Sequence, residues 1–174
     1  MNIAVIKNKL ADNAKDIKLN LSTVLTEEGA PDLSFKQMTL IALASAYATK
    51  NTFLIQQLSD ESDTTLNNLE REAAKSAAII MAMNNIYYRF VHLASDKAYA
   101  SMPAKLRMNV IANPGISKVD FELMCLAVSA INGCGMCIDA HANALNKEGT
   151  TKLAIQSTIR IAAILNATAL ALEI

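Results

Sequence analysis

The sequence predicts an all-α protein, a single-domain bundle of helical hairpins, and three observations lead to this prediction. Just over half of the 174 residues are hydrophobic, and Ala, Leu, Ile and Met supply most of them, a composition that favours helices over strands. Apolar side chains recur at three- and four-residue spacing along much of the chain. The five Gly and three Pro fall where helices should stop. Because a chain of this length can bury a full core, we expect one domain over residues 1–174.

The first part of the chain predicts two helices with a loop between them. Residues 3–21 carry apolar positions at helical spacing, which is typical of one amphipathic helix. Residues 27–32 are expected to form a loop. Ser34, followed three residues later by Gln37, is a capping-box pattern that opens the second helix. We expect residues 50–52 to interrupt that helix.

The middle of the chain predicts one long helix and then an irregular stretch. The long helix has an apolar face at Leu66, Leu69, Ala73, Ala77 and Ile80. Asn84 continues the same face, so it would be an interior polar group that needs hydrogen-bond partners. Residues 98–116 include two prolines and are expected to form short helical pieces and a loop. Ser117 as N-cap, with the acidic Asp120 in the first turn, opens the helix that carries Glu122.

Two halves of the chain resemble each other weakly. Residues 43–46 resemble residues 127–130, and residues 77–80 resemble residues 162–165, at offsets of 84 and 85 residues. Ala-rich sequence also gives such matches by chance, so duplication and coincidence both stay open. If the chain is duplicated, only the second copy holds the cysteine pair, because the matching stretch of the first half lacks any thiol.

Composition argues against several classes of protein. Sixteen basic residues balance sixteen acidic ones without forming a basic stripe, so nucleic acid is not an expected partner. The N-terminal apolar run is too brief for a signal peptide, and the longest charge-free run, residues 123–138, is too short and too interrupted to span a membrane. Three cysteines in this arrangement do not resemble a secreted disulfide framework. We therefore expect a cytoplasmic protein.

One cluster, Glu122, Cys134, Cys137 and His141, suggests the chemistry. If a helix begins near residues 132–133, the two cysteines and the histidine fall on one helical face. If the chain also turns at residues 131–132, Glu122 and His141 lie at similar distances from the turn. Antiparallel packing of the two helices would then set Glu122 beside His141.

Such a cluster can carry out thiol–disulfide chemistry. The positive end of a helix lowers the pKa of a cysteine near it, and the thiolate is the attacking form. His141 could take the thiol proton while Glu122 orients the imidazole. One of the two cysteines, Cys134 and Cys137, could attack a peroxide or disulfide and the other could resolve the product. This cycle requires no metal and no bound cofactor, and the spacing leaves open which thiol attacks first.

Two other interpretations use the same residues. Cys134, Cys137 and His141 could ligate zinc with Cys125 or His92 as the fourth ligand, in a zinc-stabilised helical interaction module without catalysis. The second CxxC or HxxxH pair usual in such sites is missing. Cys125 lies on a strongly apolar segment and is expected to be a buried small hydrophobe, and His92 to be a surface or capping group. A plain helical scaffold with unreactive thiols is the third interpretation.

At these residues the sequence resembles the AhpD family of alkyl hydroperoxide reductases, within the carboxymuconolactone decarboxylase-like superfamily. The cluster fits the family pattern E-x11-C-x2-C-x3-H without a gap. Residues 14–22, 83–89 and 106–115 also resemble the family, so the similarity runs nearly end to end. The resemblance implies an all-helical fold and a homo-oligomer, often a trimer.

The resemblance also implies an antioxidant activity. It implies reduction of an oxidised AhpC-type peroxiredoxin with electrons from a lipoylated protein, dihydrolipoamide being the donor group, and weak reduction of hydroperoxides by the protein itself. Cys137 would form the sulfenic acid and the mixed disulfide, and Cys134 would be its disulfide partner and proton donor. Glu122 and His141 would form the proton relay.

The chain departs from some family members at one position. Those members carry a further histidine between the two cysteines, where this chain has Met136. Proton transfer must then rest on His141 and Glu122. A decarboxylase or lactone-processing role, as in distant relatives, is disfavoured because that chemistry has no evident use for a CxxC pair.

Overall fold

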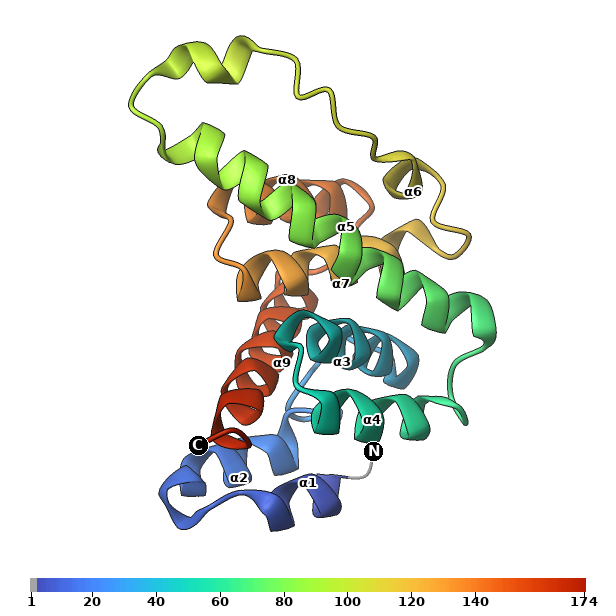
Figure 1. The fold of residues 1–174 in the computed structure, drawn as a ribbon. Helices are drawn as coiled ribbons and strands as arrows, with labels where there is room; N and C mark the ends of the chain where they lie inside the picture. The colour runs from blue at the N-terminus through green and yellow to red at the C-terminus, as the bar shows by residue number, and fades with distance from the viewer. Residues whose placement is uncertain (1–2) are drawn as a thin grey trace.

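The computed structural model describes residues 3–174, and within this part of the chain every regular element is a helix (Figure 1). The all-α prediction is therefore confirmed. In chain order the helices are α1 (Ile3–Lys9), the 3-10 helix η1 (Asp12–Ala14), α2 (Lys15–Thr23), α3 (Phe35–Thr49), α4 (Thr52–Ser62), α5 (Asn68–Leu93), the 3-10 helix η2 (Lys97–Ser101), α6 (Asn109–Ala112), α7 (Lys118–Ile131), α8 (Gly135–Lys147) and α9 (Lys152–Ala171).

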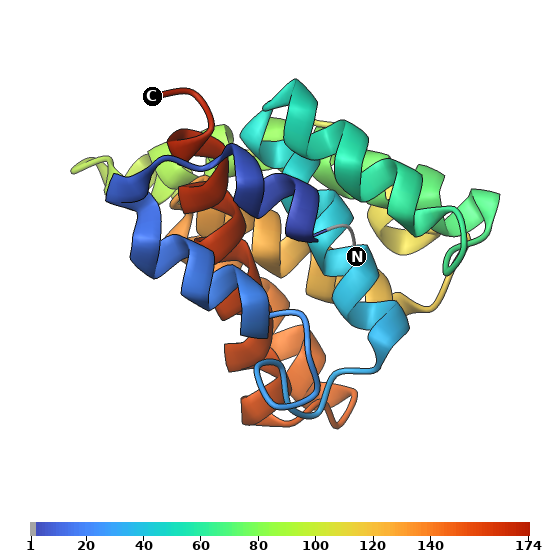
Figure 2. The same cartoon turned by 90° about the horizontal axis from the view of Figure 1, so that it is seen from below.

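The core of the protein lies where α3, α7 and α9 pack against one another. Residues 38–46 of α3 and residues 120–129 of α7 are buried without interruption, so these two helices are enclosed on all sides. Helix α5 crosses α3 and α7, and α8 packs on α5 and α7. In the view from below, α1 and α2 lie in front, across α9 and α3 (Figure 2). Helix α8 thus lies on the other side of the core from α1 and α2.

The single helix expected over residues 3–21 is wrong, because the chain breaks there into α1, η1 and α2. Asp12 and Asn13 fall at the break, and both residue types compete with the helix for backbone hydrogen bonds. The break lets α1 pack against α2. Ile6 and Leu21 are both fully buried as a result.

The expected interruption at residues 50–52 is confirmed, but the sequence patterns did not predict the helix that follows it. Lys50 ends α3 in the left-handed conformation, with φ of 63°. The side chain of Asn51 then accepts a hydrogen bond from the backbone N–H of Leu54 at 2.7 Å and begins α4. Leu54 and Leu58 bury one face of this helix.

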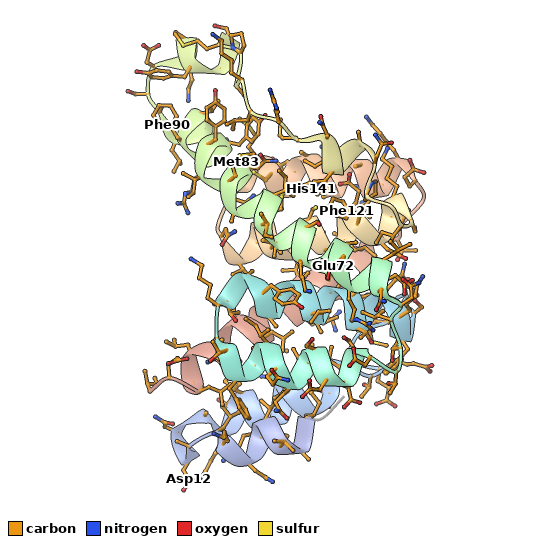
Figure 3. The ribbon with its side chains drawn as sticks, turned by 45° about the vertical axis from the view of Figure 1, so that its right-hand side comes forward. Asp12, Glu72, Met83, Phe90, Phe121 and His141 are labelled. Atoms are coloured by element: carbon orange, nitrogen blue, oxygen red, sulfur yellow. A yellow bond between two sulfur atoms is a disulfide. The ribbon has the colours of Figure 1, made fainter. Side chains whose placement is uncertain are left out.

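The other expected elements are present. Ser34 and Gln37 form the predicted capping box of α3, and the side chain of Ser117 caps α7. The long helix is α5, and the irregular stretch contains only η2 and α6, joined by extended chain that loops away from the bundle (Figure 1). Phe90 on α5 holds this excursion by packing on Tyr99, with 4.9 Å between ring centroids (Figure 3).

Helix α9 is the one described helix long and apolar enough to cross a membrane by length and composition. It lies inside the bundle, where it contacts α2, α3 and α7. Its buried face includes Ser157 and Thr158 beside Ile161 and Leu165. The core helix of a globular protein passes the same test of length and hydropathy.

The internal duplication stays a prediction, and the N-caps of two runs of three helices recur at nearly constant spacing. Helices α3, α4 and α5 are followed by α7, α8 and α9 in the same order, and each helix has a side-chain N-cap. The matching caps are 83 or 84 residues apart: Ser34 and Ser117, Asn51 and Cys134, Asn67 and Thr151. Helix α4 thus corresponds to α8, which carries the two cysteines.

Candidate redox site

The site is built on the hairpin between α7 and α8. Gly133 follows α7 with φ of 69°, a left-handed conformation that glycine adopts without strain. Cys134 donates its backbone N–H to the carbonyl of Ser129 at 3.1 Å, which closes the turn. Helix α8 begins at Gly135, slightly later than the start near residues 132–133 that the sequence predicted.

Cys134 is the N-cap of α8 rather than a residue inside its first turn. Its Sγ accepts a hydrogen bond from the backbone N–H of Cys137 at 3.3 Å. The structure joins the two cysteines in a disulfide with 5.3 Å between their Cα atoms. Both side chains are buried. When the disulfide is reduced, a thiolate on Cys134 would sit at the positive end of α8 with a backbone donor already in place.

Glu122 and His141 meet across the hairpin, as the residue count predicted. Oε2 of Glu122 lies 2.6 Å from Nδ1 of His141. The exposed fractions of the two residues are 5% and 8%, so water screens this contact very little. Figure 3 places His141 in the layer of α5, α7 and α8, far from the N-terminal helices. The carboxylate fixes the ring in one orientation.

The second nitrogen of His141 contacts a methionine that helical periodicity did not single out. Nε2 lies 3.2 Å from Sδ of Met81, a residue of α5. A proton on Nε2 makes this contact a hydrogen bond, whereas a bare Nε2 would face the sulfur lone pairs. With Glu122 on the other nitrogen, both ring nitrogens of His141 contact a side chain of the protein.

A polar network anchors the end of α7 to α5. Nδ2 of Asn85 donates to Oγ of Ser129 at 2.9 Å, and its Oδ1 accepts from Nδ2 of Asn132 at 3.0 Å. Arg89 donates to the backbone carbonyl of Asn132 at 2.7 Å. This network fixes the turn that precedes Cys134. Helical periodicity gave no sign of it, because its partners lie more than 40 residues apart in sequence.

A cavity of about 360 Å³ adjoins the cluster between α5 and α8. Cys137, His141 and Glu122 line it, whereas Cys134 does not. The remaining lining is mostly apolar and comprises Met81, Asn84, Tyr88, Met108, Ile111, Met136, Ala140 and Ala144. A molecule in this cavity would therefore reach Cys137 and not Cys134.

The other candidate residues lie outside this arrangement. Cys125 is free and buried, and burial raises the pKa of its thiol well above the usual value, with a further contribution from the Glu122 carboxylate. His92 is exposed near the end of α5. In residues 3–174 no three side chains of His, Cys, Asp or Glu are grouped so that they could hold a metal ion. The zinc interpretation therefore lacks a ligand set in the described chain.

Comparison with known proteins places the chain in a family. The carboxymuconolactone decarboxylase family matches residues 97–174, which include the whole cluster. The alkyl hydroperoxide reductase AhpD of Coxiella burnetii (strain RSA 493 / Nine Mile phase I) is 59% identical over 160 residues, covering 92% of this chain and 90% of the relative. The chain belongs to the AhpD family. The AhpD proteins of Rhodopseudomonas palustris (strain BisA53) and Beijerinckia indica are each 52% identical over 173 residues, covering 99% of this chain and 94% of each relative.

The similarity to these relatives covers nearly the whole length of this chain. The roles of Glu122, Cys134, Cys137 and His141 stay predictions. The geometry brings all four together and adds Met81 and Asn84, whose part in the site needed the packing of α5 to be seen.

Proposed function

We propose that the protein is a thiol-dependent alkyl hydroperoxide reductase and disulfide reductase that cycles through a Cys134–Cys137 disulfide. Its electrons would come from a lipoylated protein, and its physiological acceptor would be an AhpC-type peroxiredoxin, as in the antioxidant system of the family. A reducing cytoplasm suits such a cycle. The observation that supports the proposal most is the asymmetry of the two sulfurs: Cys137 lines the cavity and Cys134 caps the helix.

The asymmetry suggests how the disulfide is reduced. One thiolate of dihydrolipoamide attacks Sγ of Cys137, the sulfur that the cavity reaches, and the bond to Cys134 breaks. Cys134 leaves as a thiolate at the N-terminus of α8, where the backbone N–H of Cys137 stabilises it. The second thiol of the donor then displaces Cys137 and closes the lipoyl disulfide. Two electrons have passed to the protein, and both cysteines are reduced.

The reduced protein would then pass these electrons to an acceptor. The Cys137 thiolate attacks one sulfur of a peroxiredoxin disulfide, and Cys134 resolves the mixed disulfide. With a hydroperoxide the same thiolate attacks oxygen, becomes a sulfenic acid and condenses with Cys134 with loss of water. The His141–Glu122 pair beside Cys137 supplies the proton that each leaving group needs.

We also propose that the protein is a homo-oligomer. Ile79, Ile86 and Leu93 lie seven residues apart on α5, and 72%, 66% and 71% of these side chains are exposed. An apolar line at this spacing is typical of a helix that packs against another helix. Ile86→Glu should reduce the mass measured by sedimentation equilibrium. An unchanged mass would remove this face from the interface.

The experiment that tests the function is peroxide reduction by the purified protein with dihydrolipoamide, with and without an AhpC-type peroxiredoxin. We expect slow turnover of an alkyl hydroperoxide without the peroxiredoxin and much faster turnover with it. Cys137→Ser should abolish both activities. Full activity in that variant would contradict the proposal.

A further inference from the structure

We propose that Asn84 binds the hydroperoxide group of an alkyl hydroperoxide while the cavity beside it holds the alkyl chain. This inference rests on the proposed function and assigns a substrate-binding residue to the redox site. It is carried by an unpaired polar atom, by the place of its residue in the cavity that Cys137 also lines, and by the apolar lining of that cavity.

Asn84 is buried, and the oxygen of its side-chain amide, Oδ1, has no hydrogen-bond partner among the described residues. Its exposed fraction is 4%. The adjacent Asn85 is equally buried, yet its amide bonds to Ser129 and Asn132. Buried polar groups are almost always paired, because leaving one unpaired is destabilising. Oδ1 of Asn84 is therefore an acceptor that no described residue uses, enclosed at the edge of the cavity that Asn84 lines.

Because of where Asn84 lies, a ligand bound at the redox site could donate a hydrogen bond to its Oδ1. Asn84 lies on α5 and lines the same cavity as Cys137 and His141 on α8. It follows Met81 by three residues, so it lies on the helix face from which Met81 contacts His141. Rotation about the soft χ2 torsion of Asn turns the amide toward the cavity. A molecule near Cys137 would thus meet one hydrogen-bond acceptor on the facing helix.

The rest of the cavity favours an alkyl group over a small polar substrate. Its apolar lining includes Met108, Ile111, Met136, Ala140 and Ala144. A volume of about 360 Å³ is in the range of small-molecule sites and far exceeds that of hydrogen peroxide. An alkyl chain would bury this apolar surface, whereas hydrogen peroxide would leave it uncovered.

In this arrangement Cys137 and Cys134 together supply the two electrons that reduce the hydroperoxide to an alcohol. The O–H of the hydroperoxide donates to Oδ1 of Asn84, which holds the terminal oxygen toward Cys137. The Cys137 thiolate attacks that oxygen, an S–O bond forms and the O–O bond breaks. The leaving alkoxide takes a proton from His141 and departs as the alcohol. The sulfenic acid then condenses with the Cys134 thiol to give the disulfide and water, which returns the protein to the state in which dithiols reduce it.

Single-turnover oxidation of the reduced full-length protein tests the proposal. The probes are cumene hydroperoxide and hydrogen peroxide, and the readout is the rate of disulfide formation after rapid quenching with an alkylating agent. Asn84→Leu should lower the rate constant for both peroxides about tenfold, the effect of losing one hydrogen bond. Reduction of the disulfide by dithiothreitol should stay within about twofold, because sulfur attack on sulfur uses no acceptor on Asn84.

Two further variants separate the amide from the cavity. Ala140→Leu narrows the apolar wall, so it should slow oxidation by cumene hydroperoxide more than oxidation by hydrogen peroxide. Asn143→Leu, on the exposed face of α8, is the matched control and should change neither rate. Asn84→Leu removes an unpaired buried acceptor, so its melting temperature should not fall, and Asn84→Ala provides the same test if the leucine does not fit.

Several outcomes overturn the proposal. Unchanged peroxide rates in Asn84→Leu and Asn84→Ala would leave the proposed function standing and remove Asn84 from substrate binding. Equal losses in oxidation and in reduction by dithiothreitol would mean that Asn84 acts only on the structure of the site. A wild-type protein that oxidises with neither peroxide would overturn this inference together with the peroxidase half of the proposed function.

Discussion

The unit of α3, α4 and α5 and the unit of α7, α8 and α9 use the same helix order for different purposes. In each unit a polar or thiol side chain caps the short middle helix and accepts from the backbone N–H three residues later. Three positions at a constant offset of 83 residues separate a structural hairpin from a candidate redox site: Asn51 and Cys134, Leu54 and Cys137, Leu58 and His141.

The fourth residue of the cluster also has a structural counterpart. Thr39, on α3, stands 83 residues before Glu122, and its hydroxyl donates to the backbone carbonyl of Phe35 at 2.8 Å. Asn51 likewise serves stability, because its amide donates to the carbonyl of Ala169 at 3.3 Å and to the Glu173 carboxylate at 2.7 Å. A helical hairpin can thus acquire thiol chemistry through a few side chains while its backbone plan stays the same.

Substitutions at the matched pair Leu54 and Cys137 should distinguish the two units most clearly. Cys137→Ser should lower dithiol-dependent peroxide turnover at least about 1,000-fold, because the attacking sulfur is gone. Leu54→Ala should leave turnover of the folded protein unchanged and lower the free energy of unfolding by about 2–5 kcal/mol, since Leu54 is fully buried. Turnover assays and urea unfolding of both variants measure the two effects. Loss of turnover in folded Leu54→Ala would show that the first unit takes part in the chemistry.

Substitution of Glu122 or His141 should have the next largest effect on turnover. Glu122→Gln or His141→Phe should slow turnover about 100-fold or more, the usual contribution of general acid–base catalysis, and should change the pH dependence of the rate. Thr39→Val is the matched control and should preserve both rate and pH profile. An unaltered pH–rate profile in both pair variants would remove Glu122 and His141 from the mechanism.

The sequence predicted the part of the site that depends on local spacing. The E-x11-C-x2-C-x3-H pattern and the hairpin count predicted that Glu122 and His141 meet, and the contact at 2.6 Å agrees. The contacts of Met81 and the burial of Asn84 without a partner depend on how α5 crosses α8, which periodicity does not specify. The helical pattern marked Asn84 as an interior polar group but led us to expect partners for it.

The fold was predictable where caps and periodicity agreed. Ser34 with Gln37 and Ser117 marked two helix starts correctly. The chain over residues 3–21 kept a helical pattern across its break, because both short helices bury side chains at helical spacing. Asp12 and Asn13 favour a break there, and the packing of α1 on α2 completes the burial of both short helices.

The thiol of Cys125, which lies on α7 outside the Cys134–Cys137 pair, should be inert. Burial raises the pKa of Cys125 well above its usual value, and the Glu122 carboxylate adds to the shift. Its folded-state pKa lies above the unfolded one, so the neutral thiol contributes stability below about pH 8.5, and this is lost as pH rises through the folded-state value. Iodoacetamide at about pH 9 should label Cys125 only after unfolding, as peptide mass mapping can measure. Labelling of the native protein would contradict this account.

The smallest effect on stability is expected at the ion pairs of Lys36, one of which joins the two units. Nζ of Lys36, at the start of α3, lies 3.0 Å from Oε1 of Glu70 and 3.4 Å from Oδ2 of Asp120. Lys36→Met should lower the free energy of unfolding at pH 7 by less than about 1 kcal/mol, because 45% of the lysine side chain is exposed. Urea unfolding of wild type and variant measures the difference.

The pH dependence of this difference follows from Glu70. Burial alone would raise the pKa of Glu70, but the backbone N–H of Asn67 and the Lys36 ammonium lower it overall. A carboxylate with a depressed pKa stabilises the fold above the unfolded value of about 4.3, and this is lost as pH falls through the folded-state value. The gap between wild type and Lys36→Met should therefore shrink below about pH 4. A gap that grows there would contradict the assignment.

The central claim is that Cys134 and Cys137 alternate between dithiol and disulfide while Cys125 stays reduced, and thiol counting tests it most directly. The fully reduced protein, with its three thiols, is treated with one molar equivalent of cumene hydroperoxide and mapped by mass spectrometry after alkylation. We predict loss of two thiols, a Cys134–Cys137 linkage and recovery of all three thiols on addition of dihydrolipoamide. No loss of thiols, or a linkage that includes Cys125, would contradict it.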